Sequence, residues 1–188
     1  YLTWEIETDV VYKPWRFIGV GAGFLFTPPI DGNKTYSGEA RDKNLRWQIE
    51  ENRLMYLFAF RSGVYLYSPP VYLNHDHDVA LSFRVSPGVT IPLPPNLSTS
   101  VDYVPKDAII HVPATSGEVS NSHAKACYYH VKFAMALEVE RVSVLLGYTT
   151  SDYDLYGGSR NMIVEGQKIE LPRKKQAGTF FIGLTYDF

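Results

Sequence analysis

Serine and histidine residues gather in the segment Ser120–His123, which reads Ser-Asn-Ser-His. A serine hydrolase needs a serine within hydrogen-bond reach of a histidine, and a carboxylate that orients the histidine. A second pair, His130 and Glu138, lies on one face of a predicted strand, but the two side chains stand about 26 Å apart along it. No assembled nucleophile and base can be identified, so the sequence predicts no catalytic residue and favours a protein that is not an enzyme.

Side chains that could bind a metal occur at two places. The segment His75–Asp78 reads His-Asp-His-Asp, so a strand would present both imidazoles on one face. Asp152 and Asp154 offer the oxygen ligands that Ca²⁺ prefers, although two carboxylates make a small ligand set. The polar composition of turns explains both patterns equally well, and Gly157-Gly158 is typical of a turn rather than a phosphate-binding loop. The sequence thus predicts neither a metal site nor a cofactor.

The composition limits the class of protein. The chain has 188 residues, 45% hydrophobic and 14% aromatic, with a formal net charge of -2. This length predicts a single domain over residues 1–188, and the aromatic content excludes simple disorder. Without a basic excess, nucleic-acid binding is not expected. The lone cysteine, Cys127, cannot form an internal disulfide, and the longest uncharged stretch, Val85–Val101, contains four prolines, which excludes a membrane-spanning helix.

Side chains of alternating character mark seven segments of the chain. In residues 127–139 every odd position is apolar or aromatic, whereas the even positions are mostly polar or small. A period of two is typical of a strand with two different faces. The predicted strands cover residues 2–12, 16–27, 53–67, 78–92, 125–139, 142–150 and 179–188.

The two faces of these strands differ in size as well as in polarity. Small residues such as Gly19, Gly21 and Gly23 occupy the face that also carries charges, and they are unfavourable on the solvent side of a soluble sheet. Inside a narrow barrel they leave room for larger neighbours, and the large apolar face then contacts lipid. A soluble β-sandwich is the alternative. The barrel interpretation predicts a polar network in the lumen, formed by Glu5, Glu7, Asp9, Arg61, Arg84, Lys132, Glu138 and Asp187.

The last predicted strand ends in Phe180–Phe188 and resembles the closing strand of bacterial outer-membrane β-barrels, which alternates apolar residues and ends on an aromatic one. Tyr186 and Phe188 match the membrane-insertion signal that the barrel-assembly machinery recognises in that family. Residues 18–24 also resemble the glycine-rich strands of small barrels such as the transmembrane domain of outer membrane protein A. The resemblance implies an antiparallel all-β barrel in a Gram-negative outer membrane, in contact with lipid and lipopolysaccharide, and it identifies no subfamily.

Some small barrels of this kind modify lipid A, as deacylases or palmitoyl transferases. The His-x-Ser-Asn order of the deacylases is absent here, so a lipid A-modifying enzyme is kept only as an alternative function. The basic run Arg173–Lys175 could contact lipopolysaccharide phosphates, but an ordinary charged loop end is the favoured interpretation.

The connections between the predicted strands alternate in length. Long ones cover residues 27–52, 93–124 and 150–178, and the short ones lie at the opposite strand ends. Outer-membrane barrels have long extracellular loops, so the first predicted strand would run toward the periplasm. Because these barrels also have an even number of strands, the seven segments predict an eighth strand upstream. A further strand from residues 97–104 or 109–112 would change the parity of the strand count, and with it the direction of the first strand. A barrel of ten strands is the third alternative. Aromatic residues near strand ends predict interfacial girdles, formed by Trp4, Tyr12, Trp15, Tyr65, Tyr67, Tyr148 and Tyr186.

The long loops are the expected place of function. An eight-stranded barrel is filled by its own side chains, which argues against an open pore. We therefore expect a structural role or the binding of a protein or glycan ligand through the extracellular loops. A subunit of a larger outer-membrane complex is a further alternative.

Overall fold

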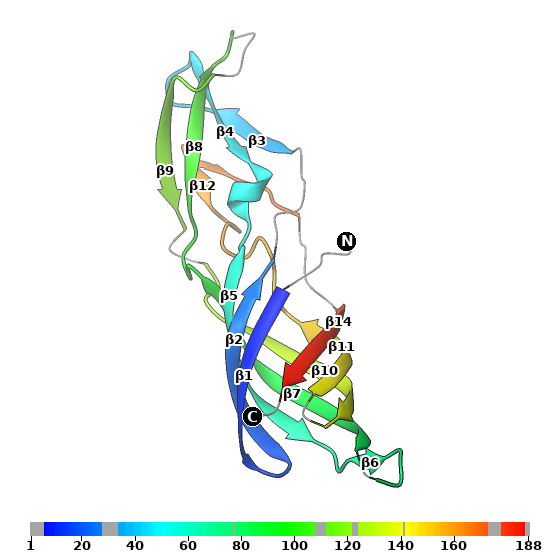
Figure 1. Cartoon of the computed structure of the whole chain (residues 1–188). Helices are drawn as coiled ribbons and strands as arrows, with labels where there is room; N and C mark the ends of the chain where they lie inside the picture. The colour runs from blue at the N-terminus through cyan, green and yellow to red at the C-terminus, as the bar shows by residue number, and fades with distance from the viewer. Residues whose placement is uncertain are drawn as a thin grey trace.

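The computed structural model describes residues 6–27, 34–76, 78–107, 112–121, 124–140, 142–172 and 178–186. Within these ranges the chain is all-β, with antiparallel sheets and one short 3-10 helix, η1 (Glu51–Leu54). None of the described helices is long and apolar enough to cross a membrane. Figure 1 shows an elongated molecule, with a large sheet at one end and smaller sheets at the other.

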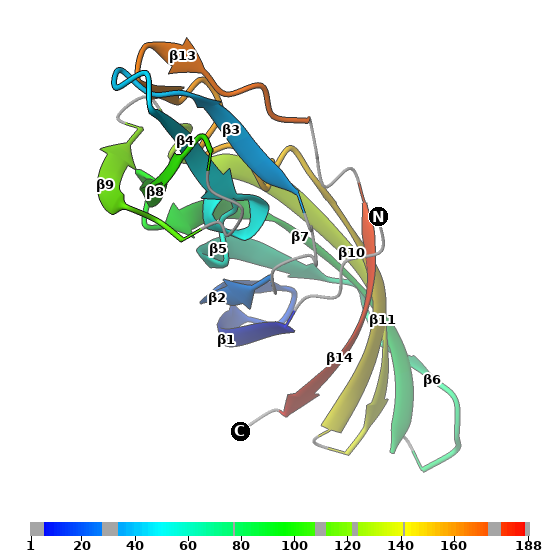
Figure 2. The same cartoon turned by 90° about the horizontal axis from the view of Figure 1, so that it is seen from above.

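The large sheet is an antiparallel meander that curls around its own interior, as Figure 2 shows from above. A two-residue strand, β6 (Val71–Tyr72), pairs with the fourth strand of the path without joining the path itself. In spatial order the strands of the path are β1 (Ile6–Trp15), β2 (Ile18–Phe26), β5 (Phe58–Tyr67), β7 (Val79–Leu93), β10 (Tyr128–Val139), β11 (Val142–Ser151) and β14 (Thr179–Tyr186).

The seven predicted strands are all present, and three of their boundaries within the described residues differ by three residues or more, including the start of β10, which lies at Tyr128 rather than at residue 125. β5 begins at Phe58 rather than at residue 53, because Leu54 and Tyr56 leave the sheet and enter a separate hydrophobic core. β1 extends to Trp15 through an irregular register, so the first turn lies at residues 16–17 rather than 13–15.

The predicted faces of the curled sheet are confirmed. Large apolar side chains point outward and are exposed, as in Val10 (81%), Phe83 (57%) and Leu146 (54%). All the exposed large hydrophobic residues of the described chain except Val112 and Ile163 lie on this sheet or in its short connections. Charged, small and hydroxyl side chains point inward together with a few larger apolar ones such as Val11 and Leu145, so the inside of the sheet is more polar than its outside.

The long connections were expected to be loops, and this expectation was wrong for much of their length. They form a second antiparallel sheet in the order β3 (Thr35–Glu39), β4 (Leu45–Glu50), β8 (Ser98–Pro105) and β9 (Thr115–Ser120), together with the hairpin of β12 (Ile163–Val164) and β13 (Gln167–Lys168). These strands are short, and β4 pairs with β8 across a long sequence separation, so local alternation gives little sign of the sheet.

A hydrophobic core joins the second sheet to the segments that follow β11. It contains Trp47 and Ile49 from β4, Val101 from β8 and Met162 beside the β12–β13 hairpin. We call the second sheet, the hairpin and this core the distal domain. The extra strand considered at residues 97–104 does form, as β8, but it belongs to the distal domain and leaves the parity of the meander unchanged. Of the segment 109–112, residues 109–111 lie outside the described chain.

Candidate functional site

Charged residues gather inside the curled sheet because strand alternation points them all to the same side. Glu7 and Asp9 come from β1, Arg61 from β5 and Lys132 from β10. The side chain of Arg61 is 3% exposed and that of Lys132 is 8% exposed, so both cations are buried. We call this cluster, together with Arg84 and Glu138, the lumen network. Two predicted members, Glu5 and Asp187, lie outside the described residues.

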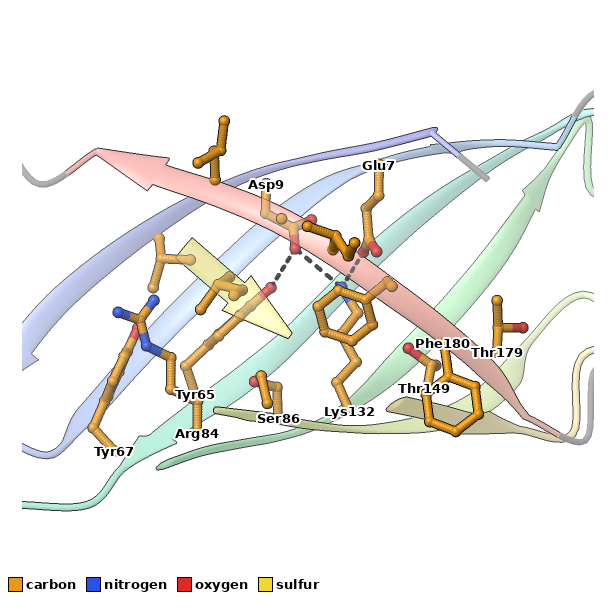
Figure 3. Close-up of a pocket in the computed structure, with 17 residues that line it drawn as sticks. Glu7, Asp9, Tyr65, Tyr67, Arg84, Ser86, Lys132, Thr149, Thr179 and Phe180 are labelled. Atoms are coloured by element: carbon orange, nitrogen blue, oxygen red, sulfur yellow. Dashed lines mark hydrogen bonds and ion pairs between the residues drawn. The ribbon is translucent and has the colours of Figure 1, made fainter. Parts of the chain in front are cut away.

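The carboxylates of β1 bind cations from strands that are not their neighbours. Lys132 Nζ contacts a carboxylate oxygen of Glu7 and lies 3.1 Å from Asp9 Oδ2, as Figure 3 shows. Arg61 Nη1 donates to Glu7 Oε2 at 3.1 Å. The hydroxyl of Tyr65 donates to Asp9 Oδ2 at 2.8 Å. The network therefore spans the interior of the sheet and links its first strand to the middle ones.

A second part of the network lies nearer the other end of the strands. Arg84 Nη2 donates to Glu138 Oε1 and to Ser143 Oγ, both at 3.1 Å. Ser82 Oγ also donates to Glu138 Oε1, at 2.6 Å. Buried charges are tolerated when they are paired and hydrogen-bonded in this way, so these contacts hold β7, β10 and β11 together on the inside.

A cavity of about 320 Å³ lies beside the first part of the network, between the two ends of the meander. Glu7, Asp9 and Val11 line it from β1, and residues 179–184 line it from β14. Lys132 and Arg84 also face it, as Figure 3 shows. The cavity is lined by both charged and apolar groups, and residues of β1 and β14 both contribute to its walls.

The outward orientation expected of the predicted girdle residues is found for only some of them. Tyr12 and Trp15 point outward and are 70% and 65% exposed, and Tyr148 is partly exposed on the same side. Tyr65 and Tyr67 instead line the lumen cavity, because the period of two places them on the same face as Arg61. Trp4 and Phe188 lie outside the described residues, and the structure describes only the backbone of Tyr186, which pairs with Val142.

The serine and histidine residues do not assemble into a hydrolytic site within the described chain. His130 is buried, and its Nδ1 lies 2.9 Å from Thr90 Oγ1, while Glu138 binds Arg84. Asn121 is also buried, and its amide donates to the carbonyls of Gly158 at 2.8 Å and Arg160 at 3.0 Å. Ser122 and His123 lie outside the described residues. The segment that contains Asn121 thus anchors a turn of the distal domain.

The aspartates considered as calcium ligands have protein partners. Asp152 Oδ1 accepts from the Tyr129 amide at 2.7 Å, and Asp152 Oδ2 contacts Lys125. Burial raises the pKa of Asp152, but these hydrogen bonds outweigh it and leave the pKa below its usual value. Asp154 Oδ2 accepts from Arg160 Nε at 2.8 Å. The described residues contain no group of three or more His, Cys, Asp or Glu side chains that could hold a metal ion.

Four buried tyrosines form the base of the distal domain, where it meets the curled sheet. Tyr128 and Tyr153 have ring centroids 5.1 Å apart in an edge-on contact, and Tyr56 and Tyr156 complete the group. Gly157 lies so close to Tyr128 that an added Cβ would overlap the tyrosine hydroxyl. The turn predicted at Gly157-Gly158 is confirmed, and tight packing explains its glycines.

Sequence reasoning missed several residues that organise this region. Glu51 accepts from the hydroxyl of Tyr156, and the guanidinium of Arg160 reaches Asp154 and the carbonyls of Leu171 and Pro172. Nothing in the local sequence distinguishes Glu51 or Arg160 from surface charges. The basic run Arg173–Lys175, predicted as a loop end, lies outside the described residues.

No protein-family model matches this chain, and comparisons with curated proteins and with solved structures also give no match.

Proposed function

We propose that this chain is a membrane-spanning β-barrel protein of a bacterial outer membrane, whose distal domain stands in water and binds a protein or glycan partner. One observation carries the proposal. The exposed large apolar side chains are concentrated on the outside of the curled sheet, whereas its charges are paired inside.

The apolar outer surface is continuous across neighbouring strands. On β10, Phe133 and Leu137 are 48% and 40% exposed, and on the adjacent β11, Val144 and Leu146 are 45% and 54% exposed. Contiguous apolar patches of more than a few hundred Å² are rare on monomeric soluble proteins and mark an interaction surface. Strands with apolar outward and polar inward residues suit a sheet that faces lipid.

The distal domain has the opposite distribution. Its core residues are buried, as in Ile49 (0%) and Val101 (0%), and among its described residues only Ile163 is a large hydrophobic side chain that is exposed on a strand. This distribution is that of a water-soluble domain. A small folded sheet held by its own core offers a rigid binding surface, which lowers the entropy cost of ordering on binding.

The interior of the curled sheet supports binding rather than transport. Lys132 and Arg61 cross the lumen to reach Glu7 and Asp9, so paired side chains occupy the path that a solute would take. An eight-stranded barrel has an interior just wide enough for such side chains. We therefore favour a sheet with a filled interior that presents the distal domain over a channel.

Two substitutions of matched exposure test the membrane assignment. Phe83 on β7 is 57% exposed and Ile163 on β12 is 61% exposed, but only Phe83 would face lipid. We expect Phe83→Arg to lower the stability of the protein in lipid vesicles by about 2–4 kcal/mol near the bilayer centre. We expect Ile163→Arg to change it little, because an exposed position in water accepts a charge.

The measurement is the urea midpoint of the gel-mobility shift between folded and heat-denatured chain, after reconstitution in phosphatidylcholine vesicles. Equal effects of the two substitutions would contradict the proposal. A chain that folds and stays monodisperse without detergent or lipid would also contradict it.

A further inference from the structure

The two ends of the curled sheet run in the same direction. The path from β1 to β14 has seven strands, and every neighbouring pair on it is antiparallel. In such a meander the first and seventh strands are parallel to each other. β1 and β14 therefore cannot close the sheet as antiparallel neighbours, but a single strand between them would be antiparallel to both.

Side-chain exposure distinguishes these two strands from the inner ones. On β14, Phe180, Ile182 and Leu184 are 81%, 79% and 75% exposed. The neighbouring residues Leu146 and Val144 on β11 point to the same side but are only 54% and 45% exposed. Neighbouring strands shield the outward side chains of the strand between them. The higher exposed fractions on β14 therefore agree with its having a neighbour on one side only.

β1 shows the same difference from its neighbour. Val10 is 81% exposed and Tyr12 is 70% exposed, whereas Val20, which pairs with Tyr12 on β2, is 47% exposed. The cavity of about 320 Å³ lies between these two edges and is lined by residues of both. An edge strand also leaves a row of backbone N–H and C=O groups available for pairing.

We propose that this gap is a docking site for one extended peptide strand, which runs antiparallel to both β1 and β14 and completes an eight-stranded barrel. The inference rests on the proposed membrane function, because a lipid-facing sheet cannot leave backbone groups unpaired in the bilayer core. The strand would hydrogen-bond to both edges by β-augmentation.

The charges of the lumen network determine the chemistry of the strand. Among the described residues the network contains three cations (Arg61, Arg84 and Lys132) and three anions (Glu7, Asp9 and Glu138), which pair with one another. A charged side chain added beside these six residues would compete for partners that are already paired, and its burial would be costly. The strand should therefore carry neutral, small or hydroxyl residues on its inward face and apolar residues on its outward face.

β11 has this pattern and supplies the probe. A synthetic peptide with the sequence of Val142–Ser151 places Ser, Leu, Gly and Thr on one face and Val, Leu, Tyr and a terminal Thr on the other. β11 already pairs with β14 in an antiparallel register. One control peptide has the same composition with the apolar residues grouped together. A second control carries Glu at the position of Gly147, on the inward face.

Hydrogen exchange of the full chain in detergent micelles tests the proposal. With the probe peptide we expect backbone amides of β1 and β14 to exchange about tenfold more slowly, and those of β7, which has a neighbour on both sides, to stay unchanged. The grouped control should have no effect, and the Glu control should bind more weakly than the probe.

Three results would overturn the proposal. One is no protection of β1 and β14 by the probe peptide. Another is protection of these edges equal to that of β7 before any peptide is added. The third is formation of a disulfide-linked dimer by Leu184→Cys in a Cys127→Ser background, but not by Leu146→Cys, because a second copy would then cover the edge. None of these results would change the outcome of the Phe83→Arg comparison, so the two proposals fail separately.

Discussion

Removal of the Lys132 ammonium group tests whether the lumen network holds the curled sheet together. The side chain of Lys132 is 8% exposed and lies between Glu7 and Asp9, whose side chains are 20% and 21% exposed. Substitution by Met keeps the length of the side chain but leaves two neighbouring carboxylates without their shared cation. Breaking a buried ion pair by removing one partner costs about 3–5 kcal/mol, and we expect Lys132→Met to lower the free energy of unfolding by that amount.

Lys125 provides the matched control. It contacts Asp152 in the same kind of ion pair, but the two side chains are 51% and 41% exposed. Solvent screens such a pair, so Lys125→Met should cost less than about 1 kcal/mol.

The assay is urea unfolding of each variant in detergent micelles, followed by tryptophan fluorescence and by gel mobility. Combining Lys132→Met with Asp9→Asn should recover part of the loss, because the uncompensated charge of Asp9 is then removed while Glu7 keeps its ion pair with Arg61. If Lys132→Met costs no more than Lys125→Met, the network does not stabilise the sheet and the reasoning is refuted.

Two further predictions concern the distal domain. An epitope tag can be placed after Gly166, at the tip of the β12–β13 hairpin, where an added Cβ would meet nothing within 4 Å. We expect antibody to label this tag on intact cells, whereas a tag at Asp76 should be labelled only after the membrane is disrupted. The opposite pattern would reverse the proposed orientation. Burial raises the pKa of Tyr56 to about 12, so its contribution to stability should be complete below pH 10 and fall between pH 10 and 12, as measured by pH-dependent urea unfolding. Tyr56→Phe should reduce this alkaline loss by the share of Tyr56 and leave that of Tyr36 and Tyr103, whose pKa values burial also raises. An unchanged profile would contradict the assignment to Tyr56.

The strands of the curled sheet were predictable because their pattern is local. In β10 each odd residue from Tyr129 to Val139 points outward and each even residue from Tyr128 to Glu138 points inward, as the period of two requires. The inward placement of Glu7, Asp9, Arg61, Arg84, Lys132 and Glu138 was predicted for the same reason. Whether the sheet closes, and whether it spans a membrane, stay predictions.

The distal domain was not predictable from the same pattern. β4 pairs with β8 through contacts such as Gln48 with Asp102, and η1 interrupts a segment whose alternation indicates a strand. Leu54 and Tyr56 have the periodicity of the sheet that follows, but burial in the distal core decides their position.

The sequence alone determined which side of each long strand is polar and which is apolar, because alternation is a property of the extended backbone itself. Only the tertiary structure decided which charges meet. Lys132 reaches Glu7 because the curvature of five neighbouring strands brings β10 opposite β1, and curvature depends on the twist and packing of the whole sheet. The same curvature places β1 and β14 on either side of one cavity, and the parity of the strand path makes these two edges parallel.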